Sequence, residues 1–251
     1  MDVHYTEGIG YGRFKSFEAF PGVAAFFTTR KGGVSSAPFD SLNMGLGTDD
    51  AYELVAENRR RFFQAVQIPQ DLIVRQKQVH EDQIAYVTEP SLIGDTDACY
   101  TDRENVFLTV TVADCVPILF YEPRKKIAGV IHAGWRGTEK AIARKTIEQV
   151  KSQFQADASE IVAVIGPSIS VKHYEVSEDV AEKFDRQFIH RNGFPKPHLD
   201  LWQANAFQLR AAGVENITIS GLCTIEHGDL FFSHRGSGGK SGRMIGVIGI
   251  K

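Results

Sequence analysis

The chain has 251 residues, of which 43% are hydrophobic and 24% are charged, and its formal net charge at pH 7 is −3. These proportions are ordinary for a globular protein with a sizeable core, and the slightly acidic balance gives no general attraction to nucleic acid or to an anionic membrane. The amino-terminal residues lack the pattern of a secretory signal, and no apolar run approaches the roughly 18 residues of a membrane span. We therefore expect a cytoplasmic protein with neither nucleic-acid nor membrane partners.

In the first part of the chain, the pattern predicts a lead-in over residues 1–22, a strand over 23–30 and a helix over 51–67. A loop rich in Gly, Ser and Pro separates the strand from the helix. Asp50 is the expected N-cap of the helix, with Glu53 completing a capping box. Pro69 is expected to end it.

The central part of the chain is rich in strand signals. Alternating and β-branched residues predict strands over 72–76, 83–87, 106–112, 116–121 and 127–132. A helix over 138–154 and a strand over 161–165 follow. Because several strands follow one another without an intervening helix, the order argues against a simple alternating parallel fold. We expect helices packed outside a mixed sheet.

The last part of the chain predicts two more helices and three strands. Ser177 and Asp200 are the expected N-caps of the helices, and the second helix ends at Gly213. The strands are expected near 214–219, 229–233 and 244–250. No repeat or low-complexity linker divides the sequence, so we expect residues 1–251 to form a single domain.

Three residues with metal-binding side chains stand where predicted strands end or turn: His80, Cys115 and His132. Two imidazoles and one thiolate suit Zn²⁺, and three protein ligands with a fourth position left open are typical of a catalytic zinc site. Taken singly, each has a plainer interpretation, as a hydrogen-bonded structural histidine or a small buried cysteine. Their spacing is too long for a zinc finger, so such a site has to be assembled by folding.

The other cysteines and several acidic residues have plainer interpretations. Cys99 and Cys223 are expected to be core thiols, and the absence of a CxxC pair fits a reducing compartment. Asp114, beside Cys115, could accept a bond from a ligand imidazole, act on a substrate or cap a turn. A short acidic cluster is expected to lie in a solvated loop and consists of Asp95, Asp97 and Asp102.

Six short segments form a series along the chain. They are Thr28 to Ser35, Gln78-Val79-His80, Ala113 to Pro117, His132 to Gly137, Gly166 to Ile169 and Phe231 to Ser233. In this order they resemble the YfiH/laccase-domain family, also called DUF152, and the resemblance covers the chain from about Val23 to Ile250. The His-Ala-Gly-Trp-Arg-Gly and Ala-Asp-Cys-x-Pro segments are its most specific parts.

The resemblance implies a single-domain α/β/β/α sandwich with mixed β-sheets, of the YfiH/CNF1-like type. It also implies a zinc-dependent purine nucleoside phosphorylase that cleaves adenosine, inosine and guanosine with phosphate to free base and ribose 1-phosphate. Methylthioadenosine phosphorylase and adenosine deaminase activities are further implied, although the deaminase His-x-Glu and Pro-Cys-x-x-Cys signature is absent. The family's metal ligands, which are also its catalytic residues, map onto His80, Cys115 and His132.

Phosphorolysis requires cationic donors that hold phosphate beside the anomeric carbon of the sugar. Arg136, four residues after His132 and near a predicted helix start, is a candidate for a bidentate grip on phosphate, or for a surface ion pair. Arg30 and Ser35 are candidates for contacts with phosphate or ribose, although their loop is also a plain turn. The series departs from the family where His234-Arg235 stands in place of the more usual Tyr-Arg, which bears on substrate preference.

Other functional classes compete with the phosphorylase. In a metal-free hydrolase acting on a cell-wall precursor, His80 or His132 would activate Cys115 as a nucleophile. The copper laccase that the family name suggests fits less well, because the eight histidines include no His-x-His pair for a multicopper cluster. A non-enzymatic binding module is the weakest alternative. Zn²⁺ is thus the expected cofactor, with copper less fitting, and the expected partners are purine nucleosides and phosphate, with the oligomeric state left open.

Overall fold

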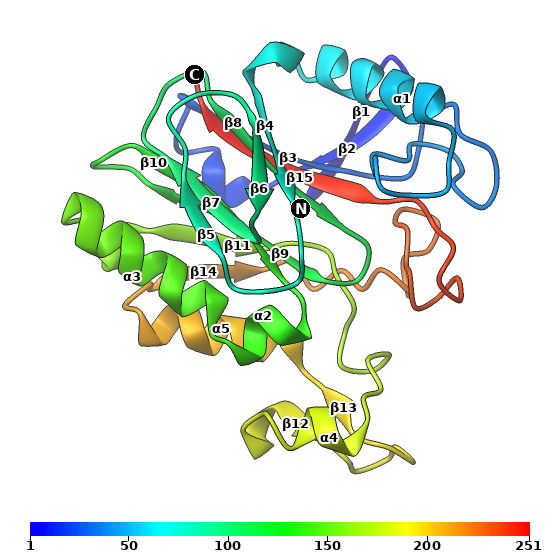
Figure 1. The fold of residues 1–251 in the computed structure, drawn as a ribbon, viewed down its shortest axis with the longest axis vertical. Helices are drawn as coiled ribbons and strands as arrows, with labels where there is room; N and C mark the ends of the chain where they lie inside the picture. The colour runs from blue at the N-terminus through cyan, green and yellow to red at the C-terminus, as the bar shows by residue number, and fades with distance from the viewer.

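Two β-sheets lie face to face, and helices cover both outer sides (Figure 1). The computed structural model describes residues 1–251 throughout. The expected α/β/β/α sandwich with mixed sheets is confirmed. Most neighbouring strands are antiparallel, and four pairs of neighbours are parallel.

The first sheet has seven strands in the order β1-β2-β3-β15-β8-β4-β6. Their bounds are β1 Asp2–Thr6, β2 Ile9–Arg13, β3 Val23–Thr28, β4 Ile73–Lys77, β6 Leu92–Asp95, β8 Phe107–Val112 and β15 Met244–Ile250. Helix α1, Tyr52–Ala65, lies on the outer side of this sheet (Figure 1).

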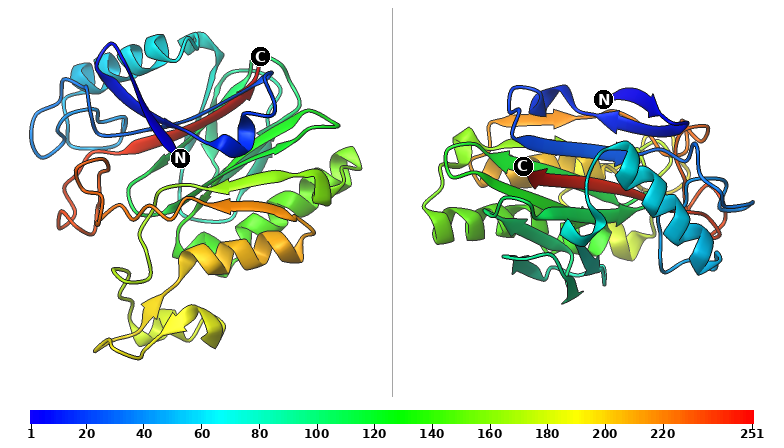
Figure 2. Two further views of the ribbon diagram at one scale, coloured as in Figure 1. Left: turned by 180° about the vertical axis from the view of Figure 1, so that it is seen from behind. Right: turned by 90° about the horizontal axis from the view of Figure 1, so that it is seen from above.

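The second sheet has six strands in the order β14-β11-β9-β10-β7-β5. Their bounds are β5 Ile84–Tyr86, β7 Ala98–Thr101, β9 Val116–Glu122, β10 Ile127–Ala133, β11 Val162–Ile165 and β14 Asn216–Ile219. Helices α2 Trp135–Glu139, α3 Ile142–Phe154 and α5 Leu201–Ala211 cover its outer side. A two-stranded sheet, β12 Ile189–His190 with β13 His198–Leu199, and helix α4, Glu178–Ala181, form a lobe that projects from the body (Figures 1 and 2).

The alternation of side chains along the strands builds three apolar layers. On β3, Phe26 faces α1, whereas its neighbour Phe27 is fully buried between the sheets. On β9, Leu119 enters the space between the sheets and Phe120 packs under α3 and α5. Each sheet is therefore apolar on both faces, which explains the continuous hydrophobic runs of its central strands.

Several sequence predictions are corrected by the structure. Residues 1–22 are more than a lead-in, because β1 and β2 form a hairpin that extends the first sheet. The helix expected over 138–154 is two helices, separated at Ala141, whose φ is 60°. The helix expected after Ser177 has only four residues, and Ser177 makes no side-chain capping bond. Residues 229–233 form no strand.

The caps at Asp50 and Asp200 have opposite outcomes. Asp50 does not cap α1, whose N-cap is Ala51; its carboxylate instead accepts bonds from Ser35 and Asn43 in the preceding loop. Asp200 caps α5 as expected, accepting from the backbone N–H of Gln203 at 3.0 Å. No helix is both long and apolar enough to traverse a membrane.

Candidate metal centre

The strand register of the second sheet brings the three expected ligands to one end of it. His132 lies on β10 opposite Pro117 of β9, so Cys115, which directly precedes β9, lies beside the end of β10. Cys115 also occupies the short connection by which the chain passes from β8 in the first sheet to β9 in the second. His80 lies in the loop between β4 and β5, with a positive φ of 61°. The site therefore forms where the two sheets are joined.

Asp97, directly before β7, orients His132. The side chains of both residues are buried, and His132 Nδ1 lies 2.7 Å from Asp97 Oδ1. The backbone N–H of His132 also donates to the carbonyl of Asp97 at 2.7 Å. Because Nδ1 is engaged by the carboxylate, Nε2 is the nitrogen left to bind a metal.

The same carboxylate fixes the loop that carries His80. Asp97 accepts from the backbone N–H groups of Val79 at 3.1 Å, His80 at 3.0 Å and Glu81 at 2.9 Å. Its burial raises the pKa of Asp97, but His132 and these N–H groups lower it further, and the net shift is downward. The expectation that Asp97 belongs to a solvated acidic loop is therefore wrong.

Gln78 fastens the His80 loop to the first sheet. Its side-chain amide donates to the carbonyl of Thr111 on β8 at 2.8 Å and accepts from the backbone N–H of Thr111 at 2.7 Å. This pair of bonds holds the loop against the strand that leads to Cys115. The Gln-Val-His segment thus contributes a positioning amide as well as an imidazole.

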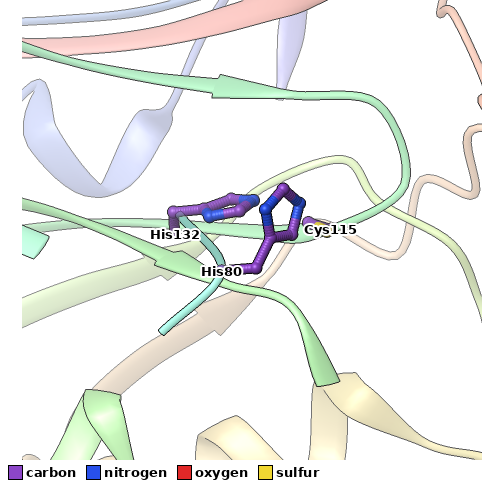
Figure 3. Close-up of side chains that lie close together, drawn as sticks. All are labelled: His80, Cys115 and His132. Atoms are coloured by element: carbon purple, nitrogen blue, oxygen red, sulfur yellow. The ribbon is translucent and has the colours of Figure 1, made fainter. Parts of the chain in front are cut away.

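The three donor side chains converge as Figure 3 shows. Their possible ligand atoms all lie within 4.8 Å of one another, and the rings of His80 and His132 are nearly perpendicular, at 82°, with centroids 4.7 Å apart. His80 is exposed, Cys115 half-buried and His132 buried, so one side of the group is open to solvent. A Cβ at Gly134 would lie only 3.1 Å from the Cys115 Sγ, which explains why no side chain stands there.

The charges of the group suit a metal ion. Burial alone raises the pKa of the Cys115 thiol, but His132 and His80 outweigh it and lower this pKa to about 6. Burial lowers the pKa of His132, whereas the Cys115 thiolate and Asp97 raise it to about 9. A thiolate and two imidazoles are borderline-soft donors, so the set fits Zn²⁺ held by three protein ligands.

Asp114 does not contact a ligand imidazole. Its Oδ1 accepts from the Thr224 hydroxyl and its Oδ2 from the backbone N–H of Arg235, both at 2.6 Å. Asp114 therefore holds the 224–235 segment beside Cys115. This role is nearest to the turn-capping role among the three that the sequence left open.

The residues expected to bind substrate lie in different surroundings. Arg136 is exposed on α2, with its guanidinium 4.3 Å from the Trp135 ring centroid. Arg30 is engaged by Asp40, by the carbonyl of Gly228 and by the ring of Phe232.

Ser35 is buried in the loop before α1. Its hydroxyl donates to Asp50 at 2.6 Å and accepts from Asn58 at 2.8 Å. Because both of these bonds stay inside the protein, the Ser35 hydroxyl stabilises its own loop and offers no free donor to a substrate.

Sequence reasoning missed Asp97, Gln78 and Tyr174. The ring of Tyr174 lies under the guanidinium of Arg235, whose backbone N–H donates to Asp114 beside Cys115. Asp97 carried a usable signal, because a lone acid directly before the apolar run Ala98-Cys99-Tyr100 has to be buried or to end a strand. Gln78 and Tyr174 carried no such signal, because their partners are distant in sequence.

A second group of metal-binding side chains, His173, Cys223 and Glu226, also brings its ligand atoms within 4.8 Å of one another. Glu226 is already paired with Lys172 at 2.8 Å and with His173 at 3.2 Å, so the protein itself balances its charge. A hollow of about 780 Å³ lies in the projecting lobe around residues 181–192 and does not include the three expected ligands.

The sequence is similar to one protein family and to several bacterial proteins. The family model described as multi-copper polyphenol oxidoreductase laccase matches residues 24–251. The chain is 38% identical to purine nucleoside phosphorylase YlmD of Bacillus subtilis (strain 168), covering 91% of this chain and 89% of that protein. It is 39% identical to the purine nucleoside phosphorylase of Deinococcus radiodurans, covering 89% and 88%.

Solved structures agree closely with the fold. The crystal structure of the hypothetical protein YfiH from Bacillus licheniformis has a TM-score of 0.92 at 34% identity, covering 99% of both chains. A Neisseria meningitidis protein described by the name DUF152 has a TM-score of 0.81 at 30% identity, covering 92% of this chain and 95% of the other. Sequence motifs, fold and relatives therefore agree, and the chain belongs to the laccase-domain family, also known as YfiH or DUF152.

Proposed function

We propose that this protein is a zinc-dependent purine nucleoside phosphorylase. It would cleave adenosine, inosine and guanosine with phosphate to free base and ribose 1-phosphate, with methylthioadenosine phosphorolysis and adenosine deamination as further activities. The observation that carries the proposal is the convergence of His80, Cys115 and His132 at one open site, in a chain whose relatives are named purine nucleoside phosphorylases.

The chain's own residues account for how the metal would be held. Asp97 keeps a proton on Nδ1 of His132 and so directs Nε2 to the ion, while Gln78 and Asp97 fix the loop of His80. Cys115 supplies a thiolate whose pKa is already low. When bound, Zn²⁺ together with one thiolate and two neutral imidazoles would carry a net charge near +1 and stabilise an anion at the open side.

Arg136 is the proposed phosphate contact on the protein. Its guanidinium lies on α2, which begins three residues after His132, and no carboxylate lies within 4.0 Å of it. A guanidinium can bind two phosphate oxygens at once and hold the nucleophile in line with the anomeric carbon. Arg30 would contribute to the substrate site only indirectly, by holding the loops around Asp40 and Gly228.

A second candidate is the metal-free cysteine hydrolase acting on a cell-wall precursor. The low pKa of Cys115 and the raised pKa of His132 describe a thiolate and imidazolium pair, which is also the resting state of a cysteine nucleophile. The two functions compete for Cys115, because a thiolate bound to zinc is a poor nucleophile. The copper chemistry in the family description is less well supported, since the donors in this site and in the second group include only three histidines.

Product analysis with a panel of nucleosides tests the proposal. With phosphate, adenosine or inosine is expected to give free base and ribose 1-phosphate, and chelation or His80→Ala is expected to abolish this turnover. His190→Ala, which changes an exposed histidine of the projecting lobe, serves as the matched control and should retain activity. Turnover that persists without phosphate and after chelation would favour the hydrolase, and full activity of His80→Ala would reject the zinc site.

A further inference from the structure

Tyr174 presents a free hydroxyl near the three expected metal ligands. It lies in the segment that follows β11, it is half-buried, and its hydroxyl makes no hydrogen bond within the protein. The guanidinium of Arg235 lies over its ring, 5.3 Å from the centroid. A half-buried hydroxyl without a partner is suited to donate to a ligand.

Arg235 is held in place by contacts that leave its charge uncompensated. Its backbone N–H donates to Asp114, the neighbour of Cys115, and its Nη1 donates to the carbonyl of Glu175 at 2.9 Å. No carboxylate lies within 4.0 Å of its guanidinium, although fourteen other lysines and arginines of the chain do have such a partner. The remaining N–H groups of Arg235 are therefore free to bind an anion.

The surroundings of Tyr174 place these groups beside the site. Burial raises the pKa of Tyr174, the charges of Cys115 and Asp114 raise it further, and those of Arg235 and Arg136 act in the opposite direction. The contacts agree with this: the Arg235 guanidinium lies over the Tyr174 ring, and the Arg235 backbone N–H donates to Asp114, which directly precedes Cys115. The raised pKa also means that Tyr174 is a neutral O–H donor at physiological pH.

We propose that Tyr174 and Arg235, together with Arg136, form a subsite for a tetrahedral oxyanion, inorganic phosphate, next to the His80, Cys115 and His132 group. The identity of this anion as the co-substrate rests on the proposed phosphorylase function. Two guanidinium groups offer paired N–H donors to phosphate oxygens, and the Tyr174 hydroxyl offers a third, neutral donor.

Two acidic residues lie beside this subsite, and each carboxylate is already engaged within the protein: Glu175 pairs with Lys196 at 2.8 Å, and Asp114 is hydrogen-bonded. Both carboxylate oxygens of Asp114 accept short bonds, from the Thr224 hydroxyl and from the Arg235 backbone N–H. Asp114 therefore holds the 224–235 segment through these two bonds. It binds the backbone of Arg235 and not its guanidinium. The arrangement fixes the position of the Arg235 main chain while its side chain remains available.

Direct binding of inorganic phosphate to the zinc-loaded protein, measured by equilibrium dialysis with radiolabelled phosphate and no nucleoside, tests the subsite. Arg235→Gln and Arg136→Gln are each expected to weaken phosphate binding by about tenfold or more, and Tyr174→Phe by about three- to tenfold. Arg235→Lys is expected to retain part of the affinity. Arg210→Gln, an exposed arginine of α5, and Tyr52→Phe, an exposed tyrosine of α1, are the matched controls and should bind phosphate as the parent protein does.

Zinc content and thermal midpoint are measured for each variant, so that a folding defect is not mistaken for lost binding. Unchanged phosphate affinity in both Arg235→Gln and Tyr174→Phe would overturn the subsite, and so would a parent protein that binds no phosphate at millimolar concentration. If the parent binds phosphate, the variants lose it and no nucleoside is cleaved, the subsite stands while the phosphorylase proposal fails. In an active enzyme, the variants should raise the KM for phosphate much more than the KM for nucleoside.

Discussion

Asp97 is the residue on which the geometry of the candidate metal centre depends most. One buried carboxylate accepts from the imidazole of His132 and from three successive backbone N–H groups of the His80 loop. Two of the three expected ligands are therefore positioned by a single side chain. Such outer partners fix the tautomer of a ligand histidine and raise its affinity for the metal.

Asp97→Asn is expected to weaken zinc binding by about 10- to 100-fold, because an amide replaces two acceptor oxygens with one and places N–H donors against the N–H groups of the loop. Competition against a chromophoric chelator measures the change. Asp95→Asn is the control, since Asp95 is exposed and its pair with Lys77 is a surface ion pair. Equal zinc affinity in the two variants would show that Asp97 does not position the ligands.

The pH dependence of zinc uptake follows from the shifted groups. In the metal-free protein His132 has a pKa of about 9 and Cys115 a pKa of about 6, so near pH 8 the thiolate is present and His132 carries a proton. Zinc must displace that proton, so uptake at pH 8 should release about one proton and affinity should fall roughly tenfold per pH unit from pH 9 to 7.5. Below pH 6 the proton on Cys115 must also leave, which steepens the fall. Uptake at pH 8 without proton release would contradict these shifts.

Among the elements, the break between α2 and α3 has the clearest consequence for the site. The sequence pattern predicts one helix, yet Ala141 adopts a left-handed conformation and α3 begins again at Ile142. The short α2, which begins three residues after His132 and carries Arg136, is therefore a separate helix from α3. A non-glycine residue in this conformation bears a steric cost between Cβ and the backbone.

Ala141→Gly is expected to raise the free energy of unfolding by about 0.5–1 kcal/mol, because the relief of that steric cost exceeds the greater entropy of glycine in the unfolded chain. Urea unfolding measures the change. Ala56→Gly, in the middle of α1, should instead lower the free energy of unfolding by about 1 kcal/mol. If Ala141→Gly lowered the free energy of unfolding as much as Ala56→Gly does, the left-handed conformation of Ala141 would carry no steric cost.

The sequence pattern misplaced two elements, for different physical reasons. The run Leu230-Phe231-Phe232 looks like a strand, but Phe231 and Phe232 are buried without joining a sheet: Phe231 packs edge-on against Phe27 and Phe232 lies under Arg30. In the opposite direction, β1 and β2 carry little apolar alternation, and their pairing follows from the turn at Glu7 and Gly8, both with positive φ.

At the scale of the whole molecule, we propose that residues 1–251 fold as a single domain. The layer between the sheets takes side chains from both of them, and the candidate metal centre takes Cys115 from the connection between them. Separating the sheets would therefore expose the central apolar layer and pull the site apart. One cooperative unfolding transition is expected.

The substitution Leu108→Ala tests whether the chain folds as a single domain. Leu108 is fully buried on β8 in the first sheet, and its truncation is expected to lower the free energy of unfolding by about 2–5 kcal/mol. Both tryptophans, Trp135 and Trp202, lie in helices that cover the second sheet, so their fluorescence reports on the opposite side of the molecule. In a single domain, the fluorescence and far-UV circular dichroism midpoints shift together. A fluorescence midpoint unchanged by Leu108→Ala would indicate two independent units.

The amino-acid sequence by itself determined the central strands, the α1, α3 and α5 helices in outline, and the three donor residues, because apolar periodicity and the chemistry of histidine and cysteine are local properties. Only the tertiary structure decided that Asp97 is buried, that Gln78 is fixed to Thr111 and that Ser35 is occupied within its own loop. It also decided that Arg235 binds Asp114, the neighbour of Cys115, and lies over Tyr174. These relations join residues that are 15 to more than 60 positions apart, through strand register and loop packing. No local pattern encodes such distances, so they arise only when both sheets are assembled.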